Sequence, residues 1–318
     1  MNDPKQAQLD RFYEINKQLE SALSRVILGK HDVIRKVLAA LYSNGSILLE
    51  DVPGVGKTTM AKALAKCLGS IFKRIQFTPD LLPADILGGS VYNPQSGEFD
   101  FRHGPIFTNI LLADEINRAS PRTQSALLEA MSERQVTVEG ITMKLDEPFL
   151  VVATQNPIEF QGTYPLPEAQ LDRFLISLKI GYPSPEEELA MLFQQKNNDP
   201  LESSAVVCEA NELKEIQQHV CDIQLEKSVG KYIIDIVNAT RNNQRIRLGA
   251  SPRASLMILR ISQATAFLEQ RTFVTPDDVK FCVKDVLSHR LIGESQFTND
   301  DHKDELLQEL IDTVIIPT

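Results

Sequence analysis

Short apolar runs and helical repeats alternate over the first 180 residues of the chain. Five runs have the length of strands and lie at 46–49, 72–77, 110–113, 149–153 and 174–180. After the first run, residues 57–68 place Met60, Leu64 and Leu68 on one face at helical spacing, and Gly69 supplies a stop. Near-continuous apolar strands separated by helices are typical of a sheet that is covered on both faces. The pattern therefore predicts an α/β fold with a parallel sheet.

Two segments of alternating apolar and polar residues interrupt this pattern and predict small hairpins. The first covers 91–101, where Asn93 to Gly97 supplies the turn. The second covers 136–145 and turns at Glu139 and Gly140. Alternating residues on both sides of a short turn that contains glycine are typical of paired antiparallel strands.

The pattern changes after Gly181 and becomes mostly helical as far as the end of the chain. Ser184 and Pro185 begin one helix with a capping residue and a proline at the first helical position, and Glu187 follows at the third. Residues 275–278 repeat this arrangement. We therefore expect an α/β domain over residues 1–183 and a helical domain over residues 184–318.

Length and composition narrow the class of protein. The 318 residues suggest about two domains, taking roughly 150 residues for each. No apolar run approaches the ~20 residues of a membrane span, and the polar N-terminus has no signal-peptide core. Four cysteines without a CxxC pair favour a reducing compartment, so we expect a cytoplasmic protein. The net charge of −10 argues against a general nucleic-acid binder, although it leaves room for a local basic channel.

A phosphate-binding loop is indicated at residues 54–58, between the first predicted strand and the first long helix. Glycines allow the backbone to wrap around phosphates and to point its N–H groups inward. The N-terminus of the following helix adds positive potential. In such a loop Lys57 would reach the β- and γ-phosphates, and the Thr58 hydroxyl would bind Mg²⁺.

One position departs from the full P-loop pattern, because Asp51 stands where the pattern begins with glycine. The position lies where the first strand ends. Its carboxylate need not touch the phosphates if it points away from them. The alternative interpretation of the loop is an ordinary glycine-rich turn before a helix.

An acidic pair, Asp114 and Glu115, ends the apolar run 110–113. Two carboxylates at the end of a buried strand are costly unless they meet a metal ion or hydrogen-bond donors. Asp114 therefore suits the Mg²⁺ shell, directly or through water, and Glu115 suits a base that orients the attacking water. With the P-loop upstream, the pair favours a nucleotide-hydrolysing site over an incidental acidic loop.

Six segments in this order make the chain resemble the AAA+ ATPases, and within them the MoxR family. The segments are 27–30, 52–58, 114–119, 153–157, 166–174 and 249–254. The resemblance implies a five-stranded parallel sheet of order 5-1-4-3-2, with strands numbered along the chain. It also implies that the hairpin near 91–101 is a helix-2 insert, that the one near 136–145 is a pre-sensor-1 hairpin, and that the helical domain is a lid.

The resemblance assigns roles to three polar residues. Asn156 looks like sensor 1, whose neutral amide can hydrogen-bond the attacking water or the γ-phosphate without adding negative charge. Arg173 looks like an arginine finger given to a neighbouring subunit, a device that contributes about 10³–10⁵ in turnover in GTPases. Arg253 looks like sensor 2, because a cation in the first turn of a helix opposes the helix dipole and so calls for an anionic partner. The alternatives are a turn before Pro157, a surface ion pair with Asp172, and an exposed arginine, respectively.

By the same resemblance the chain binds ATP and Mg²⁺. The expected metal ligands are Thr58 and Asp114, and Asn117 and Arg118 are expected to support the acidic pair or an interface. The expected catalytic residues are Glu115, Asn156, Arg173 and Arg253. The expected nucleotide-binding residues are Ile27, Gly29, Pro53, Gly54, Val55, Gly56, Lys57, Thr58, Thr59 and Asp114.

The expected function is ATP hydrolysis that drives chaperone-like remodelling or maturation of protein complexes, metal-cofactor assembly included. The resemblance implies a homo-oligomeric ring, often hexameric, that acts on client proteins, some of which carry von Willebrand factor type A domains. Catalysis would then depend on assembly, because the arginine finger comes from the next subunit.

Two other functions stay open. One is a nucleic-acid-remodelling motor, because ATPases with a helix-2 insert include helicases. The two hairpin segments mix basic residues such as Arg102 and Lys144 with acidic ones such as Asp100 and Glu139, which disfavours this function. The other is a nucleotide-gated scaffold with weak hydrolysis, for which Asp51 is the hint.

Overall fold

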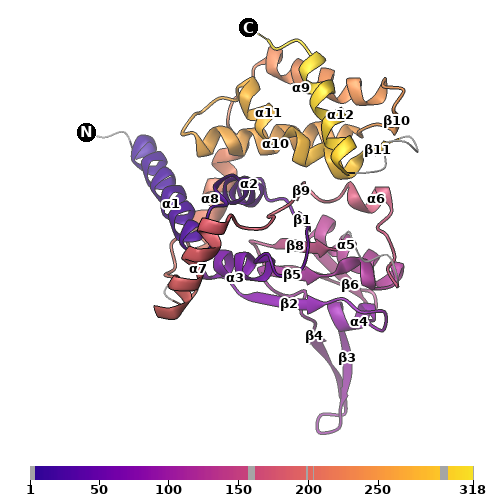
Figure 1. Cartoon of the computed structure of the whole chain (residues 1–318). Coiled ribbons are helices and arrows are strands. Elements are labelled where there is room, and N and C mark those ends of the chain that lie inside the picture. The colour runs from indigo at the N-terminus through magenta and orange to yellow at the C-terminus, as the bar shows by residue number, and fades with distance from the viewer. Residues whose placement is uncertain (1–3, 157–161, 198–199, 203, 294–299, 318) are drawn as a thin grey trace.

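The computed structural model describes residues 4–156, 162–197, 200–202, 204–293 and 300–317. Its centre is a parallel five-stranded sheet of order β2-β5-β8-β1-β9 (Figure 1). The strands are β1 (Ile47–Glu50), β2 (Phe72–Gln76), β5 (Ile110–Asp114), β8 (Leu150–Gln155) and β9 (Ile176–Leu178). This is the predicted order 5-1-4-3-2 read from the opposite edge, so both the α/β class and the order are confirmed.

Helices cover both faces of the sheet. Neighbouring residues of each strand point to opposite sides, so an apolar strand contributes to the core on each face. In β5, Ile110 and Leu112 join the core formed with α1, α2 and α3, whereas Leu111 and Ala113 join the core formed with α4 and α5. The helices are α1 (Pro4–Val26), α2 (His31–Tyr42), α3 (Lys57–Cys67), α4 (Pro83–Leu87) and α5 (Pro121–Glu133). The edge strand β2 is only partly buried and carries polar residues.

Both predicted hairpins are present as antiparallel pairs. The first pairs β3 (Gly88–Asn93) with β4 (Glu98–His103), and Figure 1 shows it projecting from the sheet on the side away from the lid. The second pairs β6 (Gln135–Val138) with β7 (Ile141–Lys144). Its two-residue turn has φ of 53° at Glu139 and 80° at Gly140, a geometry that follows the twist of the strands.

The C-terminal part is helical, and three further helical elements of the chain are short. Its helices are α7 (Pro185–Asn197), α8 (Ala210–Cys221), α9 (Lys227–Arg241), α10 (Pro252–Leu268), α11 (Pro276–Leu287) and α12 (Asp300–Thr313). The small antiparallel pair β10 (Ile246–Leu248) and β11 (Ile292–Gly293) lies beside them. The short elements are η1 (Ile116–Arg118), α6 (Glu168–Leu171) and η2 (Ser288–Arg290).

Helix starts in the lid follow the predicted capping pattern. The Ser184 N–H donates to the Glu187 carboxylate over 2.8 Å, and the Glu187 N–H donates to the Ser184 hydroxyl over 3.2 Å. Thr275 and Asp278 form the same reciprocal box at the start of α11. We propose that the domain boundary lies at residue 183, in the segment between β9 and α7.

The lid packs on the same face of the sheet as α1 to α3. Its buried residues form one continuous core with those helices. For example, the rings of Tyr42 in α2 and Phe267 in α10 meet edge to face with centroids 5.2 Å apart. The start of α3 therefore lies on the side of the molecule that faces the lid. Within the described ranges, no helix has both the length and the apolar character that crossing a membrane requires.

Candidate functional site

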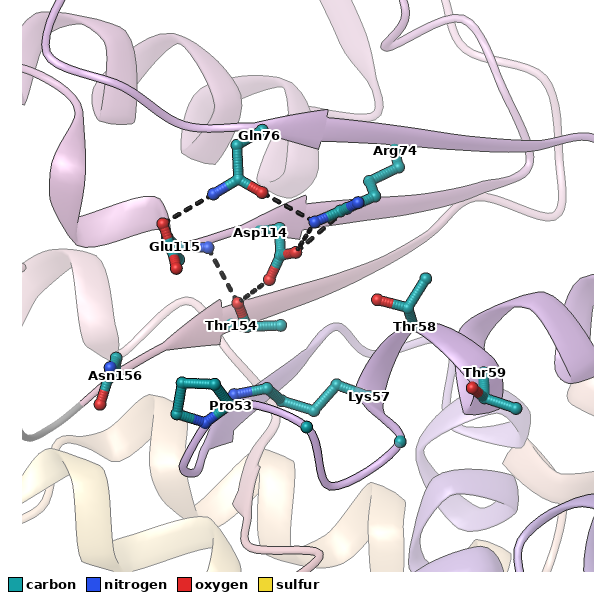
Figure 2. A pocket seen from close by; sticks show the side chains of 12 residues that line it. Pro53, Lys57, Thr58, Thr59, Arg74, Gln76, Asp114, Glu115, Thr154 and Asn156 are labelled. Carbon is teal, nitrogen blue, oxygen red and sulfur yellow. Dashed lines mark hydrogen bonds and ion pairs between the residues drawn. The ribbon is translucent and has the colours of Figure 1, made fainter.

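A cavity of about 360 Å³ lies where β1, β5 and β8 end and α3 begins. Ligands of open parallel sheets bind outside the carboxyl ends of the strands, so this is the expected place for a site. Figure 2 shows its acidic residues facing the loop that carries Pro53 and Lys57. The cavity is lined by Pro53, Gly54, Gly56, Lys57, Thr58, Thr59, Arg74, Gln76, Asp114, Glu115, Thr154 and Asn156.

The loop that enters α3 depends on two glycines in the left-handed conformation. Gly54 has φ of 88°, and Gly56, the residue before the first turn of α3, has φ of 94°. A Cβ atom on Gly54 would meet nothing within 4 Å, so backbone conformation rather than space requires glycine there. The turn brings the N-terminus of α3 to the cavity, where its free N–H groups and dipole favour an anion.

Lys57 points along the wall of the cavity toward the start of the loop (Figure 2). Its Nζ donates a hydrogen bond of 2.7 Å to the backbone carbonyl of Asp51. Burial lowers the pKa of the Lys57 ammonium, while the charges of Asp51, Asp114 and Glu115 act in the opposite direction. The lysine therefore presents its charge at a partly dry site surrounded by carboxylates.

Asp51 points its carboxylate away from the cavity and is buried. Oδ2 accepts hydrogen bonds from the backbone N–H groups of Ile180, over 2.6 Å, and Gly181, over 2.7 Å. Oδ1 accepts from the N–H of Val52 over 2.9 Å. The departure from glycine at the first P-loop position thus leaves the cavity unobstructed. The Asp51 carboxylate instead links the loop by hydrogen bonds to Ile180 and Gly181, in the segment that leads to the lid.

Asp114 ends β5 with both carboxylate oxygens occupied by donors. Oδ1 accepts from the Thr154 hydroxyl over 2.5 Å, and Oδ2 forms an ion pair of 2.6 Å with Arg74. The Thr58 side chain lines the same cavity. Hydroxyl and carboxylate oxygens are the ligands that Mg²⁺ prefers, so Thr58 and Asp114 fit that ion.

Glu115 has a left-handed backbone, with φ of 57°, which is uncommon for a residue with a side chain. Its N–H donates to the Thr154 hydroxyl over 2.8 Å. Its carboxylate accepts from the Gln76 amide over 2.7 Å and from Arg118 over 3.2 Å. Three contacts therefore hold Glu115, and the Thr154 hydroxyl links it to Asp114 by bonding to both residues.

Three lining residues were missed by the sequence interpretation, namely Arg74, Gln76 and Thr154. Arg74 and Gln76 are two residues apart on an edge strand, so both point to one side, and their Nη2 and Oε1 atoms are 2.8 Å apart. Two polar residues at this spacing on one side of a strand were an available signal. Thr154 likewise lies two residues before Asn156, which is buried and lines the cavity.

The residues predicted for the adenine side do not line the cavity, although Ile27 lies beside the P-loop. The Ile27 Cδ1 atom would lie 3.8 Å from a Cβ built on Gly56. Gly29 has φ of 71° and lies against the Glu187 carboxylate, where a Cβ would overlap the Oε1 atom at 1.5 Å. Val55 is partly buried against the main core. Five of the predicted residues, Ile27, Gly29, Val55, Arg173 and Arg253, are absent from the lining.

The two arginines predicted to complete the site lie outside the cavity. Arg173 is partly exposed between α6 and β9, and Arg253 is exposed in the first turn of α10. The expected alternative, an ion pair between Asp172 and Arg173, is replaced by an ion pair of 2.9 Å between Asp172 and Arg290. Pro157, on which the alternative interpretation of Asn156 depends, lies outside the described residues.

Two family models match this chain. A model of the ATPase family associated with various cellular activities (AAA) matches residues 46–176, and a model of the AAA lid domain matches residues 238–310. The chaperone MoxR1 of Mycobacterium tuberculosis is 41% identical over 93% of this chain and 79% of its own. The chain belongs to the MoxR family of AAA+ ATPases.

Two further relatives support this membership. The uncharacterised protein YeaC of Bacillus subtilis is 49% identical over 93% of this chain and 92% of its own. The crystal structure of a protein assigned as an ATPase from Cytophaga hutchinsonii has 36% identity and a TM-score of 0.90, over 99% of this chain and 98% of that one. AAA+ ATPases bind nucleotide, typically with Mg²⁺, and generally form oligomeric rings. The AAA match in this MoxR-family chain includes every residue that lines the cavity.

Proposed function

We propose that this MoxR-family chain hydrolyses ATP with Mg²⁺ in a homo-oligomeric ring and uses the energy to remodel protein complexes. One observation carries the proposal. A single cavity joins a lysine and a hydroxyl at the start of α3 to two carboxylates at the end of β5. That is the set of groups that phosphoryl transfer to water needs: charge neutralisation, a metal site and a base.

In this proposal the triphosphate lies over the start of α3. The loop N–H groups and Lys57 bind its oxygens, and Thr58 and Asp114 hold Mg²⁺, which supplies neutralisation of phosphate charge. The carboxylate of Glu115 accepts a proton from the attacking water. Gln76 and Arg118 hold that carboxylate by hydrogen bonds of 2.7 and 3.2 Å, so the base is oriented before the substrate arrives. Asn156 offers a neutral amide to the water or the γ-phosphate.

The remaining cations of the proposal come from outside the cavity. Arg253 acts as sensor 2 from the subunit's own lid, and Arg173 acts as an arginine finger on a neighbour's nucleotide. Their exposure supports this division, because a side chain that acts across an interface must be accessible in the single chain. Ile27, beside the P-loop, and Gly29 form the adenine side of the site in this proposal.

The partners belong to the same proposal. A ring, taken here as a hexamer, acts on client proteins, and proteins with von Willebrand factor type A domains are the first candidates. The relative named as a chaperone, MoxR1, supports work on protein clients rather than nucleic acid. Maturation of protein complexes, metal-cofactor assembly included, is the process that we propose, in the reducing compartment that the cysteine usage favours.

Glu115→Gln tests the proposal. It keeps the size of the side chain and removes its basicity, so ATP should still bind while turnover falls by about 10²–10⁴. Glu129→Gln, at an exposed position of α5, is the matched control and should hydrolyse ATP normally. Normal turnover in Glu115→Gln would overturn the assignment of the base.

The same variant separates the rival functions. Held with ATP and used as bait in cell extract, Glu115→Gln should retain specific proteins that the control releases. Salt-dependent DNA affinity with stimulated hydrolysis would instead favour a nucleic-acid motor. Hydrolysis as slow in the wild type as in the variant would favour a scaffold. The position of the Asp51 carboxylate, outside the cavity, removes the hint that pointed to a scaffold.

A further inference from the structure

Asp172 lies immediately before Arg173 and is held by two separate segments of the lid. Its Oδ1 atom forms an ion pair of 2.9 Å with the Nε of Arg290, which belongs to η2. The Ser251 hydroxyl, at the start of α10, lies 3.0 Å from Asp172 Oδ2 and 3.2 Å from Oδ1. The carboxylate of a core residue is thus bonded to groups of the lid that are 79 and 118 positions away.

The Arg290 partner is anchored so firmly that it acts as a fixed point of the lid. Its side chain is 2% exposed. The guanidinium donates to the backbone carbonyls of Val286, in the lid, and of Phe174 and Leu175, in the segment that follows Arg173. A buried arginine with this many acceptors cannot turn away without leaving donors unpaired, which is costly in the interior.

Ser251 connects the same carboxylate to the proposed sensor 2. Its hydroxyl oxygen accepts from the N–H of Ala254 and so caps α10, and the hydroxyl is also within hydrogen-bond distance of Asp172. Arg253 follows two residues later in the first turn of that helix. Burial lowers the pKa of Arg290 to about 10 against the opposing effect of Asp172, and the charge of Arg253 is a smaller contribution in the same direction as burial. Arg253 is therefore within electrostatic reach of this cluster.

We propose that Asp172 is a positioning residue that sets the direction of Arg173 according to the position of the subunit's own lid. The inference rests on the proposed roles of Arg173 as finger and Arg253 as sensor 2. When nucleotide draws Arg253 and the start of α10 inward, Ser251 pulls on Oδ2 of Asp172 while Arg290 holds Oδ1, so the carboxylate turns about its ion pair. The backbone of Arg173 follows, because it is bonded directly to Asp172. One subunit's nucleotide state would thereby govern the finger that it offers to the next.

Mixed rings test this inference, because they separate the subunit that donates a finger from the one that hydrolyses. Donor subunits carry Glu115→Gln and acceptor subunits carry Arg173→Ala. Neither kind hydrolyses ATP alone, and activity returns where a donor's finger meets an acceptor's intact Glu115. Asp172→Asn is then added either to the donor or to the acceptor. Incorporation of each variant is checked by size-exclusion chromatography.

Asp172→Asn in the donor should lower the restored activity at least ~10-fold, a modest part of the 10³–10⁵ that a finger contributes. In the acceptor, which donates no finger, the same substitution should change the restored activity less than about twofold. Equal losses in both arms would assign Asp172 a merely structural role and overturn the inference. A starting mixture without restored activity would instead overturn the finger assignment, and this inference with it.

Ser251→Ala in the donor supplies a second arm that keeps the Asp172–Arg290 ion pair and so guards against misfolding. Because it also removes a helix cap, the matched control is Ser120→Ala, which removes the cap of α5. Only Ser251→Ala should lower the restored activity. Retention of labelled ADP with aluminium fluoride by the acceptor, a binding measurement that needs no turnover, should fall in the same arms. Equal effects of the two serine variants would contradict the link through the lid.

Discussion

The carboxylate of Asp51 accepts a hydrogen bond of 2.7 Å from the backbone N–H of Gly181, which joins the start of the phosphate loop to the exit of β9. The two residues are 130 positions apart in the chain. On the other side of the same linker, the Lys30 Nζ donates to the backbone carbonyl of Tyr182 over 2.7 Å. The segment between core and lid is therefore held from both the loop and the α1–α2 turn.

Asp51→Gly restores the usual first residue of the P-loop and yet should destabilise the protein. It removes the acceptor of three backbone N–H groups, those of Val52, Gly181 and the buried residue Ile180. We expect a loss of roughly 2–4 kcal/mol in unfolding free energy, measured as a lower thermal midpoint. Asp51→Asn keeps one acceptor oxygen, so its thermal midpoint should lie between those of the wild type and Asp51→Gly. A midpoint of Asp51→Gly equal to that of the wild type would show that these bonds contribute nothing.

Gln76→Met should lower the turnover number without weakening nucleotide binding. The substitution keeps the length of the side chain but removes the amide that holds Glu115 over 2.7 Å. The base then loses one of its two side-chain donors and spends less time in the productive orientation. We expect kcat to fall by about 3- to 30-fold, less than for loss of the base itself. An unchanged kcat, with affinity measured by a fluorescent ATP analogue, would count against this role.

The pH profile of kcat/KM should carry the signature of Lys57. Because burial lowers its pKa in the free protein, the ammonium loses its proton at a lower pH than an ordinary lysine. Phosphate binding that depends on this charge is complete below that pKa and is lost as the pH rises through it. We therefore expect an alkaline limb below about pH 10.4, the usual lysine value. In Lys57→Arg this limb should move up, because arginine stays charged.

A variant on the same helix checks that limb. Lys62 is exposed on α3 and does not line the cavity. Lys62→Ala should keep both the affinity and the alkaline limb of the wild type. Lys57→Ala should weaken ATP binding by roughly 10-fold or more, as expected when a charged hydrogen-bond donor is lost. Equal affinities of Lys57→Ala and the wild type would exclude Lys57 from phosphate binding.

Thiol labelling should distinguish one cysteine from the other three. Burial raises the pKa of Cys208 and of Cys282 to about 12 each, and it also raises the pKa of Cys67. Since the thiolate is the nucleophile, these buried thiols should stay unreactive at pH 8. Exposed Cys221 should give rapid labelling of one thiol per chain by an aromatic disulfide. Cys221→Ser should abolish that phase, and rapid labelling of a second thiol would contradict the burial.

The sheet could be predicted because its strands are locally apolar, but their ends could not. The fifth run was expected to be a strand over 174–180, whereas β9 covers only 176–178. The Ile180 N–H goes to the Asp51 carboxylate, and the Phe174 carbonyl accepts from Arg290. Both groups bond to residues more than a hundred positions away, and such partners cannot be predicted from a local pattern.

The site also has a part that could be predicted from the sequence and a part that could not. The P-loop and the acidic pair are continuous in the chain, so their chemistry could be recognised before their geometry was known. Arg74 reaches Asp114 only because β2 is the neighbour of β5, a relationship that the apolar pattern of either strand does not contain. The alternative interpretation of Arg173 paired it with its neighbour Asp172, whereas the tertiary structure pairs Asp172 with Arg290.

The base of the β3–β4 hairpin has a consequence for how this protein can change. A Cβ on Gly88 would lie 2.5 Å from the Gly104 nitrogen, so the two backbones close the hairpin tightly where it leaves α4. Beyond that closure, Tyr92 and Phe99 pack mainly on each other, 5.4 Å apart, and remain exposed. A longer or shorter tip would therefore change the exposed end of the hairpin, whereas a side chain at Gly88 would disturb the closure at its base.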